Sequence, residues 1–140
     1  MKLLRTEEFK ASTAQLCQIR AEVRQACQLM HYDEADINVI TLAIDEACTN
    51  IIRYAYNGDE SGKLVIKIFQ HDDQAVFHVQ DFAKCIEKSC IELRKKKLLQ
   101  PGGLGLHLIH QVMDSVQLIP PPDGIGNILE LKKRLPTGQQ

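Results

Sequence analysis

The sequence predicts an α+β protein, a two-layer sandwich in which a mixed, mostly antiparallel sheet carries helices on one face. Its apolar patterns follow the order strand, helix, helix, strand, strand, helix, strand, strand. The strands come in hairpins, so the regular strand–helix alternation of a parallel α/β sheet is absent. With 140 residues, 44% of them apolar, the chain can bury a real core, and we expect a single domain over residues 1–140.

The first half of the chain predicts one strand and two helices. Residues 2–9 have the pattern of a short strand. A helix is expected from Ala11 to about Met30, because apolar residues recur there at helical spacing. Asp33 suits the N-cap of a second helix, which should run from Glu34 to about Tyr56 and end before the turn at Asn57-Gly58-Asp59.

The second helix is apolar almost all round in its first half. Its main apolar stripe consists of Ile37, Ile40, Ile44, Cys48, Ile51 and Ala55. Glu46 and Asn50 lie nearly opposite, on a face that also carries Val39, Leu42 and Ala43. Such a helix is expected to be covered on both sides, and the second cover around Glu46 and Asn50 would be a ligand and its lid.

The second half predicts four strands and one or two helices. The strands are expected at residues 63–71, 75–81, 115–119 and 127–134. Residues 72–74 suit a hairpin turn, and the Pro-rich run 120–124 suits a stiff one. A short helix is expected over 86–98, and another from Leu106 to about Asp114.

Composition excludes some classes of function. The net charge of −1 gives no overall basic field, so no direct nucleic-acid partner is expected, and the basic run 94–97 is interpreted as a solvated face. No apolar run approaches the ~20 residues that cross a bilayer, and the N-terminus becomes acidic before a signal-peptide core can form. We therefore expect a cytoplasmic protein without a membrane partner.

The five cysteines are odd in number and lie largely within helical patterns. This indicates buried or idle thiols in a reducing compartment rather than a disulfide framework. Cys85 and Cys90 lack a second ligand pair, which argues against zinc.

The clearest candidate for ligand binding is the run Gly102-Gly103-Leu104-Gly105-Leu106, which opens a predicted helix. A glycine-rich turn at a helix N-terminus presents unpaired backbone N–H groups, which suit a phosphate. The run has neither the Gly-Lys-Ser/Thr ending of a P-loop nor the third glycine of a dinucleotide fingerprint. A helix-start turn without a ligand therefore remains an open alternative.

Three side chains have the chemistry to complete a metal–nucleotide site. Asn50 supplies a neutral oxygen suited to Mg²⁺ beside phosphates, and Glu46, one turn earlier, suits the deprotonation of a hydroxyl or water. Asp81 ends a predicted strand, where a fixed carboxylate can accept a hydrogen bond from an adenine amino group. The alternatives are a solvated helix face for the pair and a turn-forming residue for Asp81.

Three segments together resemble the motifs of a known family. Residues 42–56 resemble the N-box of the GHKL ATPases, and more narrowly that of the anti-sigma-factor serine kinases. Val79-Gln80-Asp81-Phe82-Ala83 stands in the place of their first glycine box, and residues 101–109 resemble their second. The order of the strands and the chain length also agree, so the resemblance covers nearly the whole sequence.

The resemblance implies a Bergerat-type ATP-binding fold with ATP and Mg²⁺ as cofactors. Asn50 would bind Mg²⁺, Glu46 would be the catalytic base and Asp81 would recognise adenine, with Ala83 beside it. Residues 84–105 would form the ATP lid. Its phosphate-contacting turn would consist of Gly102, Gly103, Leu104, Gly105 and Leu106.

The resemblance also implies partners. Family members bind a sigma factor to silence it and phosphorylate a serine of an anti-sigma-factor antagonist, and a homodimer is implied. This sequence departs from the pattern, with Ala83 and Cys85 in glycine positions and Tyr54 in place of a histidine. The alternative is therefore a kinase-inactive partner-binding module of the same fold. An ATPase part of a larger histidine-kinase-like or phosphatase-linked system ranks last, because the phosphoacceptor helix hairpin is absent.

Overall fold

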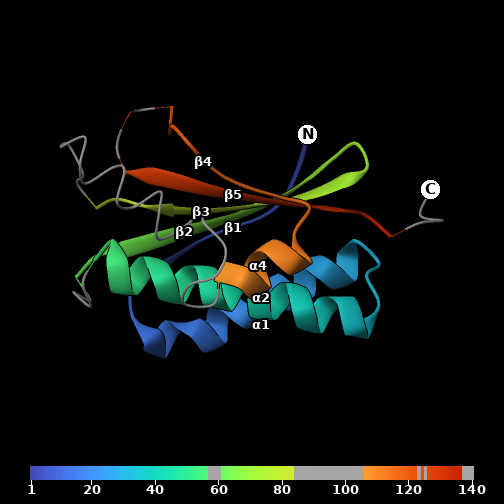
Figure 1. Cartoon of the computed structure of the whole chain (residues 1–140), viewed down its shortest axis with the longest axis horizontal. Helices are drawn as coiled ribbons and strands as arrows, with labels where there is room; N and C mark the ends of the chain where they lie inside the picture. Colours follow the sequence, from blue (N-terminus) through green and yellow to red (C-terminus); the bar gives the residue numbers. More distant parts are fainter. Residues whose placement is uncertain (57–60, 84–105, 123, 125, 137–140) are drawn as a thin grey trace.

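The sheet and the helices form two separate layers. The computed structural model describes residues 1–56, 61–83, 106–122, 124 and 126–136, and only the backbone of residues 106 and 107. The strands are β1 (Lys2–Lys10), β2 (Lys63–His71), β3 (Gln74–Asp81), β4 (Ser115–Ile119) and β5 (Asn127–Arg134). The helices are α1 (Leu16–Leu29), α2 (Glu34–Tyr54) and α4 (Leu106–Val112), with a 3₁₀ turn η1 (Thr13–Gln15). The three described α-helices lie on one face of the sheet (Figure 1), which confirms the predicted two-layer fold.

The sheet has the strand order β1-β2-β3-β5-β4, and each neighbouring pair is antiparallel. The expected mixed character is therefore wrong for the described strands. Two helices between β1 and β2 return the chain to the end of the sheet that it left, so these strands run in opposite directions. β3 and β4 run parallel to each other, because both are antiparallel to β5, which lies between them.

Both long helices are shorter than their apolar patterns predict. Residues 13–15 form η1 before α1 starts, because the Ser12 hydroxyl accepts a hydrogen bond from the backbone N–H of Ala14. The expected cap of α2 is present, since the Asp33 carboxylate accepts from the Asp36 N–H at 2.8 Å. The helix predicted over 86–98 lies outside the described residues.

The core between the layers contains the predicted stripe of α2, in which Ile37, Ile40, Ile44, Cys48 and Ile51 are at most 2% exposed. On the opposite face of α2 the apolar side chains differ in exposure. Ala43 is fully buried, whereas Val39 is 39% and Leu42 is 48% exposed. The cover expected on this face is a ligand and its lid over 84–105, which lies outside the described residues, so this cover stays a prediction.

Two of the cysteines are buried in this core. Burial raises the pKa of the Cys27 and Cys48 thiols to about 12, so both are poor nucleophiles at neutral pH. Cys17 is exposed and carries a free thiol. In the part of the chain described here, no helix is long and apolar enough to cross a membrane.

The sheet face opposite the helices carries a buried carboxylate, Glu130, which is 8% exposed. Its oxygens lie 2.9 Å from His78 Nε2 and accept a hydrogen bond from Gln117 Nε2 at 2.9 Å. Lys132 Nζ lies 3.6 Å from Glu130 Oε1. Burial opposes the charged form most strongly, but the bonds from Gln117 and His78 together with Lys132 outweigh it and lower the pKa of Glu130.

The Glu130→Gln change is expected to lower the free energy of unfolding at pH 7 by about 1–2 kcal/mol, because hydrogen bonds to a charged group are lost. A carboxyl whose pKa is lowered by folding stabilises the fold above its unfolded pKa and loses that effect as the pH falls through its folded pKa. The difference from wild type should therefore shrink below about pH 4. Urea unfolding at several pH values measures it.

Glu7→Gln serves as the control, because Glu7 is exposed on β1. It should change stability by less than about 0.5 kcal/mol at every pH. Equal behaviour of the two variants would contradict the assigned role of Glu130.

Candidate functional site

Asn50 is the most informative side chain of the candidate site. It lies on α2 and is 0% exposed, yet among the described residues neither Oδ1 nor Nδ2 has a hydrogen-bond partner. A buried amide without partners costs roughly 1–3 kcal/mol, so proteins seldom keep one without a use. The amide oxygen is a ligand that Mg²⁺ accepts, so Asn50 fits the predicted metal. The described residues hold no group of three or more His, Cys, Asp or Glu that could bind a metal instead.

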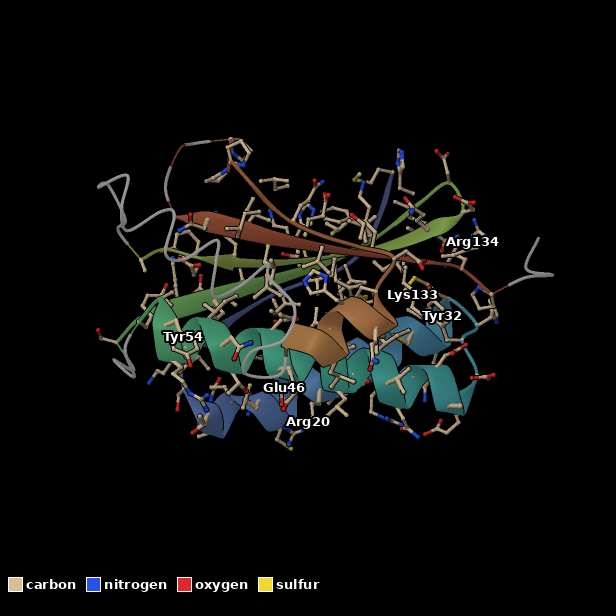
Figure 2. All side chains as sticks on the ribbon, in the orientation of Figure 1. Arg20, Tyr32, Glu46, Tyr54, Lys133 and Arg134 are labelled. Carbon is tan, nitrogen blue, oxygen red and sulfur yellow. The ribbon has the colours of Figure 1, made fainter. Side chains whose placement is uncertain are left out.

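Glu46 lies one turn before Asn50 on α2 and is partly exposed (Figure 2). Within the described part of the chain, no hydrogen bond or ion pair engages its carboxylate. The neighbouring carboxylate behaves differently, because Asp45 Oδ1 accepts a hydrogen bond from Arg20 Nη1 of α1 at 2.8 Å. Of the two adjacent acids, only Glu46 is therefore left available to take a proton from a substrate.

Asp81 is the last residue of β3 and is 1% exposed. Its Oδ1 accepts a hydrogen bond from the backbone N–H of Ala83 at 3.1 Å and lies 3.4 Å from Asn127 Nδ2. Ala83 thus helps to hold the Asp81 carboxylate through its backbone, which the extra methyl group does not prevent. The result is a fixed, buried carboxylate at the end of a central strand.

Tyr56, two residues after α2, contacts the residue that follows Asp81. Its hydroxyl accepts a hydrogen bond from the Phe82 N–H at 2.7 Å and donates one to the carbonyl oxygen of Lys63 at 2.7 Å. The C-terminal end of α2 and the end of β3 consequently lie at the same end of the molecule (Figure 1). The structure therefore brings Asp81 toward the helix that carries Glu46 and Asn50.

Two residues of this region, Gly126 and Asn127, were not assigned to the site from the sequence. Gly126 has φ +77°, and a Cβ there would lie 1.9 Å from the carbonyl oxygen of Asp81. Asn127 follows it and pairs with Asp81 across β3 and β5. The run Gly124-Ile125-Gly126-Asn127 was the signal in the sequence that could have pointed to these two residues. The strand with which it pairs cannot be inferred from the residues near it in the sequence.

The predicted phosphate turn lies outside the described residues. The structure does not describe Gly102, Gly103, Leu104 and Gly105 or the rest of the expected lid over 84–105. The phosphate-binding turn therefore stays a prediction. Leu106 begins α4, which lies beside α2 (Figure 1).

Comparison with known proteins defines the class. Residues 9–133 match the family described as the histidine kinase-like ATPase domain, and the chain belongs to that family. Among curated relatives, the serine-protein kinase RsbW of Bacillus licheniformis is 29% identical over 111 residues, which cover 71% of this chain and 68% of that protein. RsbW of Listeria monocytogenes is 29% identical over 93 residues, covering 59% of this chain and 57% of that protein.

A solved structure agrees with the fold. The catalytic domain of the histidine kinase ThkA superimposes with a TM-score of 0.57 over 94% of this chain and 97% of that domain, at 16% identity. That likeness concerns the fold alone. Together with the family match and the relatives named serine-protein kinases, it confirms the resemblance drawn from the three sequence motifs.

Proposed function

We propose that the chain binds Mg-ATP, silences a sigma factor by binding it, and phosphorylates a serine of an anti-sigma-factor antagonist. The observation that carries the catalytic part is the pair on α2. A buried amide without partners stands one turn from a carboxylate that no described residue engages. The family match, the relatives named serine-protein kinases and the sequence resemblance support the regulatory part.

Each residue has one role in this proposal. Asn50 would hold Mg²⁺, which when bound neutralises charge on the phosphates. Asp81 would accept a hydrogen bond from the adenine amino group. Glu46 would take the serine proton as the serine oxygen forms its bond to the γ-phosphorus and the bond to the departing ADP breaks.

Titration calorimetry with Mg-ATP tests the proposal against its alternative. Micromolar binding supports the kinase, and no binding at millimolar ATP supports a kinase-inactive module. The alternative is motivated by Ala83, whose methyl group stands where the family's first box has glycine. The hydrogen bond from Ala83 to Asp81 favours a competent adenine site, because it keeps the carboxylate in place.

Asn50→Leu should separate function from stability. Leucine has the same branched arrangement of heavy atoms and no unpaired polar atoms, so the nucleotide-free protein should become more stable by about 1–2 kcal/mol. Mg-ATP affinity should fall at least about tenfold, because a metal ligand is lost. Urea unfolding and calorimetry measure the two effects.

Asn38→Leu is the matched control on the same helix, where Asn38 is exposed and bonded to Arg24. It should leave Mg-ATP affinity unchanged and bring no gain in stability. An Asn50→Leu protein that binds Mg-ATP as tightly as wild type would remove the metal role from Asn50.

A further inference from the structure

The geometry points to an exposed ridge of α2 as the docking surface for the substrate protein. The α2 ridge consists of Val39 and Leu42, and it leads directly to Glu46. This inference rests on the proposed function and adds to it the place where the substrate binds and the chemistry that it presents. The substrate would place an apolar side chain on Leu42 and Val39 while its serine hydroxyl meets Glu46.

The three positions share one face of the helix. At 100° per residue, positions 39 and 42 lie within about 40° of position 46, one on each side. At about 1.5 Å per residue, Leu42 precedes Glu46 by about 6 Å along the axis and Val39 by about 10 Å. A segment lying along α2 therefore reaches both the ridge and the carboxylate within a few residues.

The ridge is unusual for its exposure. Val39 is 39% and Leu42 is 48% exposed. Among the described residues the other exposed large apolar side chains are Met1, Leu3 and Leu29. Met1 and Leu3 lie at the N-terminus, and Leu29 is the last residue of α1. Two neighbouring exposed apolar residues in mid-helix, beside an unengaged carboxylate, are therefore a distinct surface.

Both flanks of the ridge are closed by the fold itself. On the side of α1, Arg24 Nη1 donates to Asn38 at 2.9 Å and Arg20 Nη1 donates to Asp45 at 2.8 Å. On the other side Ala43 is fully buried. The arginines bridge the surfaces of the two helices and leave the apolar side chains between the flanks exposed.

The charge of Glu46 determines which kind of partner can bind to the α2 ridge. A second copy of this chain seated on the ridge would cover Glu46 and desolvate an unpaired carboxylate, which costs several kcal/mol. A substrate protein offsets part of this cost, because its serine hydroxyl donates a hydrogen bond to the carboxylate that it approaches. The occupant is therefore a protein segment with a serine and an apolar residue about 6–10 Å from it.

The test measures steady-state phosphorylation of the host's anti-sigma-factor antagonist by the Val39→Ser/Leu42→Ser double variant. Loss of two half-buried apolar contacts should raise KM for the antagonist about tenfold or more, while kcat changes far less. Val39→Ile/Leu42→Met keeps the apolar character and should restore KM to within about twofold of wild type. Leu29→Ser removes an apolar side chain that is 56% exposed, at the end of α1, and should leave KM unchanged.

The outcomes are distinguishable. No phosphorylation of the antagonist by the wild-type protein overturns the proposed function itself. Equal KM values for wild type and the double variant overturn the α2 ridge as docking surface while the proposed function stands. If the double variant instead loses only self-association, or only sigma-factor binding, with KM unchanged, the ridge belongs to that other partner and the inference is wrong.

Discussion

Glu46→Gln is expected to slow phosphorylation of the substrate serine by about 10²–10⁴-fold, the usual contribution of a positioned general base. Glutamine has nearly the same shape and can still contact the serine hydroxyl, but it cannot take its proton. Because Asn50 and Asp81 are unchanged, Mg-ATP affinity should stay within about threefold of wild type. Single-turnover phosphorylation of the antagonist with labelled ATP measures the rate, and calorimetry measures the affinity.

Asp45→Asn supplies a control one residue away. Asp45 is tied to Arg20 at 2.8 Å, and Arg20 is exposed, so the pair contributes at most about 1 kcal/mol to stability. The rate of phosphorylation should therefore change by no more than a few-fold. If the Glu46→Gln protein phosphorylates as fast as wild type, or if both variants lose the same amount of activity, Glu46 is not the general base.

The parts of the site on α2 were predictable from the sequence because they depend on helical spacing alone. Glu46 and Asn50 are four residues apart in a long apolar pattern, so they share a face wherever the helix lies. The pattern does not show which side chains of the helix are covered by neighbouring elements. Ala43 is buried while Leu42 next to it stays exposed, and this difference depends on tertiary packing.

The part of the site at the end of β3 was only partly predictable from the sequence. Asp81 was recognisable as the end of a strand, but its neighbours depend on which strand lies beside β3. The chain inserts β5 between β3 and β4, which brings residues 126 and 127 next to Asp81. Non-local strand pairing of this kind leaves no local signal, so Gly126 and Asn127 could be seen as a turn but not as part of a site.

Gly126→Ala is expected to cost about 3–5 kcal/mol of stability, which combines a left-handed backbone conformation with overpacking against a central strand. Gly126 has φ +77°, and the added Cβ would lie 1.9 Å from the Asp81 carbonyl oxygen and 2.9 Å from Phe82 Cα. These are backbone atoms of β3 and its continuation, so they cannot rotate away as a side chain would. Either the start of β5 or the end of β3, which carries Asp81, must therefore move.

Gly124→Ala separates the two causes. Gly124 has a similar φ of +72°, but a Cβ there meets nothing within 4 Å. It should therefore cost only the conformational part, about 1–2 kcal/mol, and leave Mg-ATP affinity unchanged. Urea unfolding of both variants gives the cost of the close contact as the difference between their stabilities. Calorimetry with Mg-ATP shows whether the contact also affects the proposed adenine site. If the two variants are equally stable, the tight approach of Gly126 to Asp81 does not exist in solution, and the fixed position of the Asp81 carboxylate loses its structural basis.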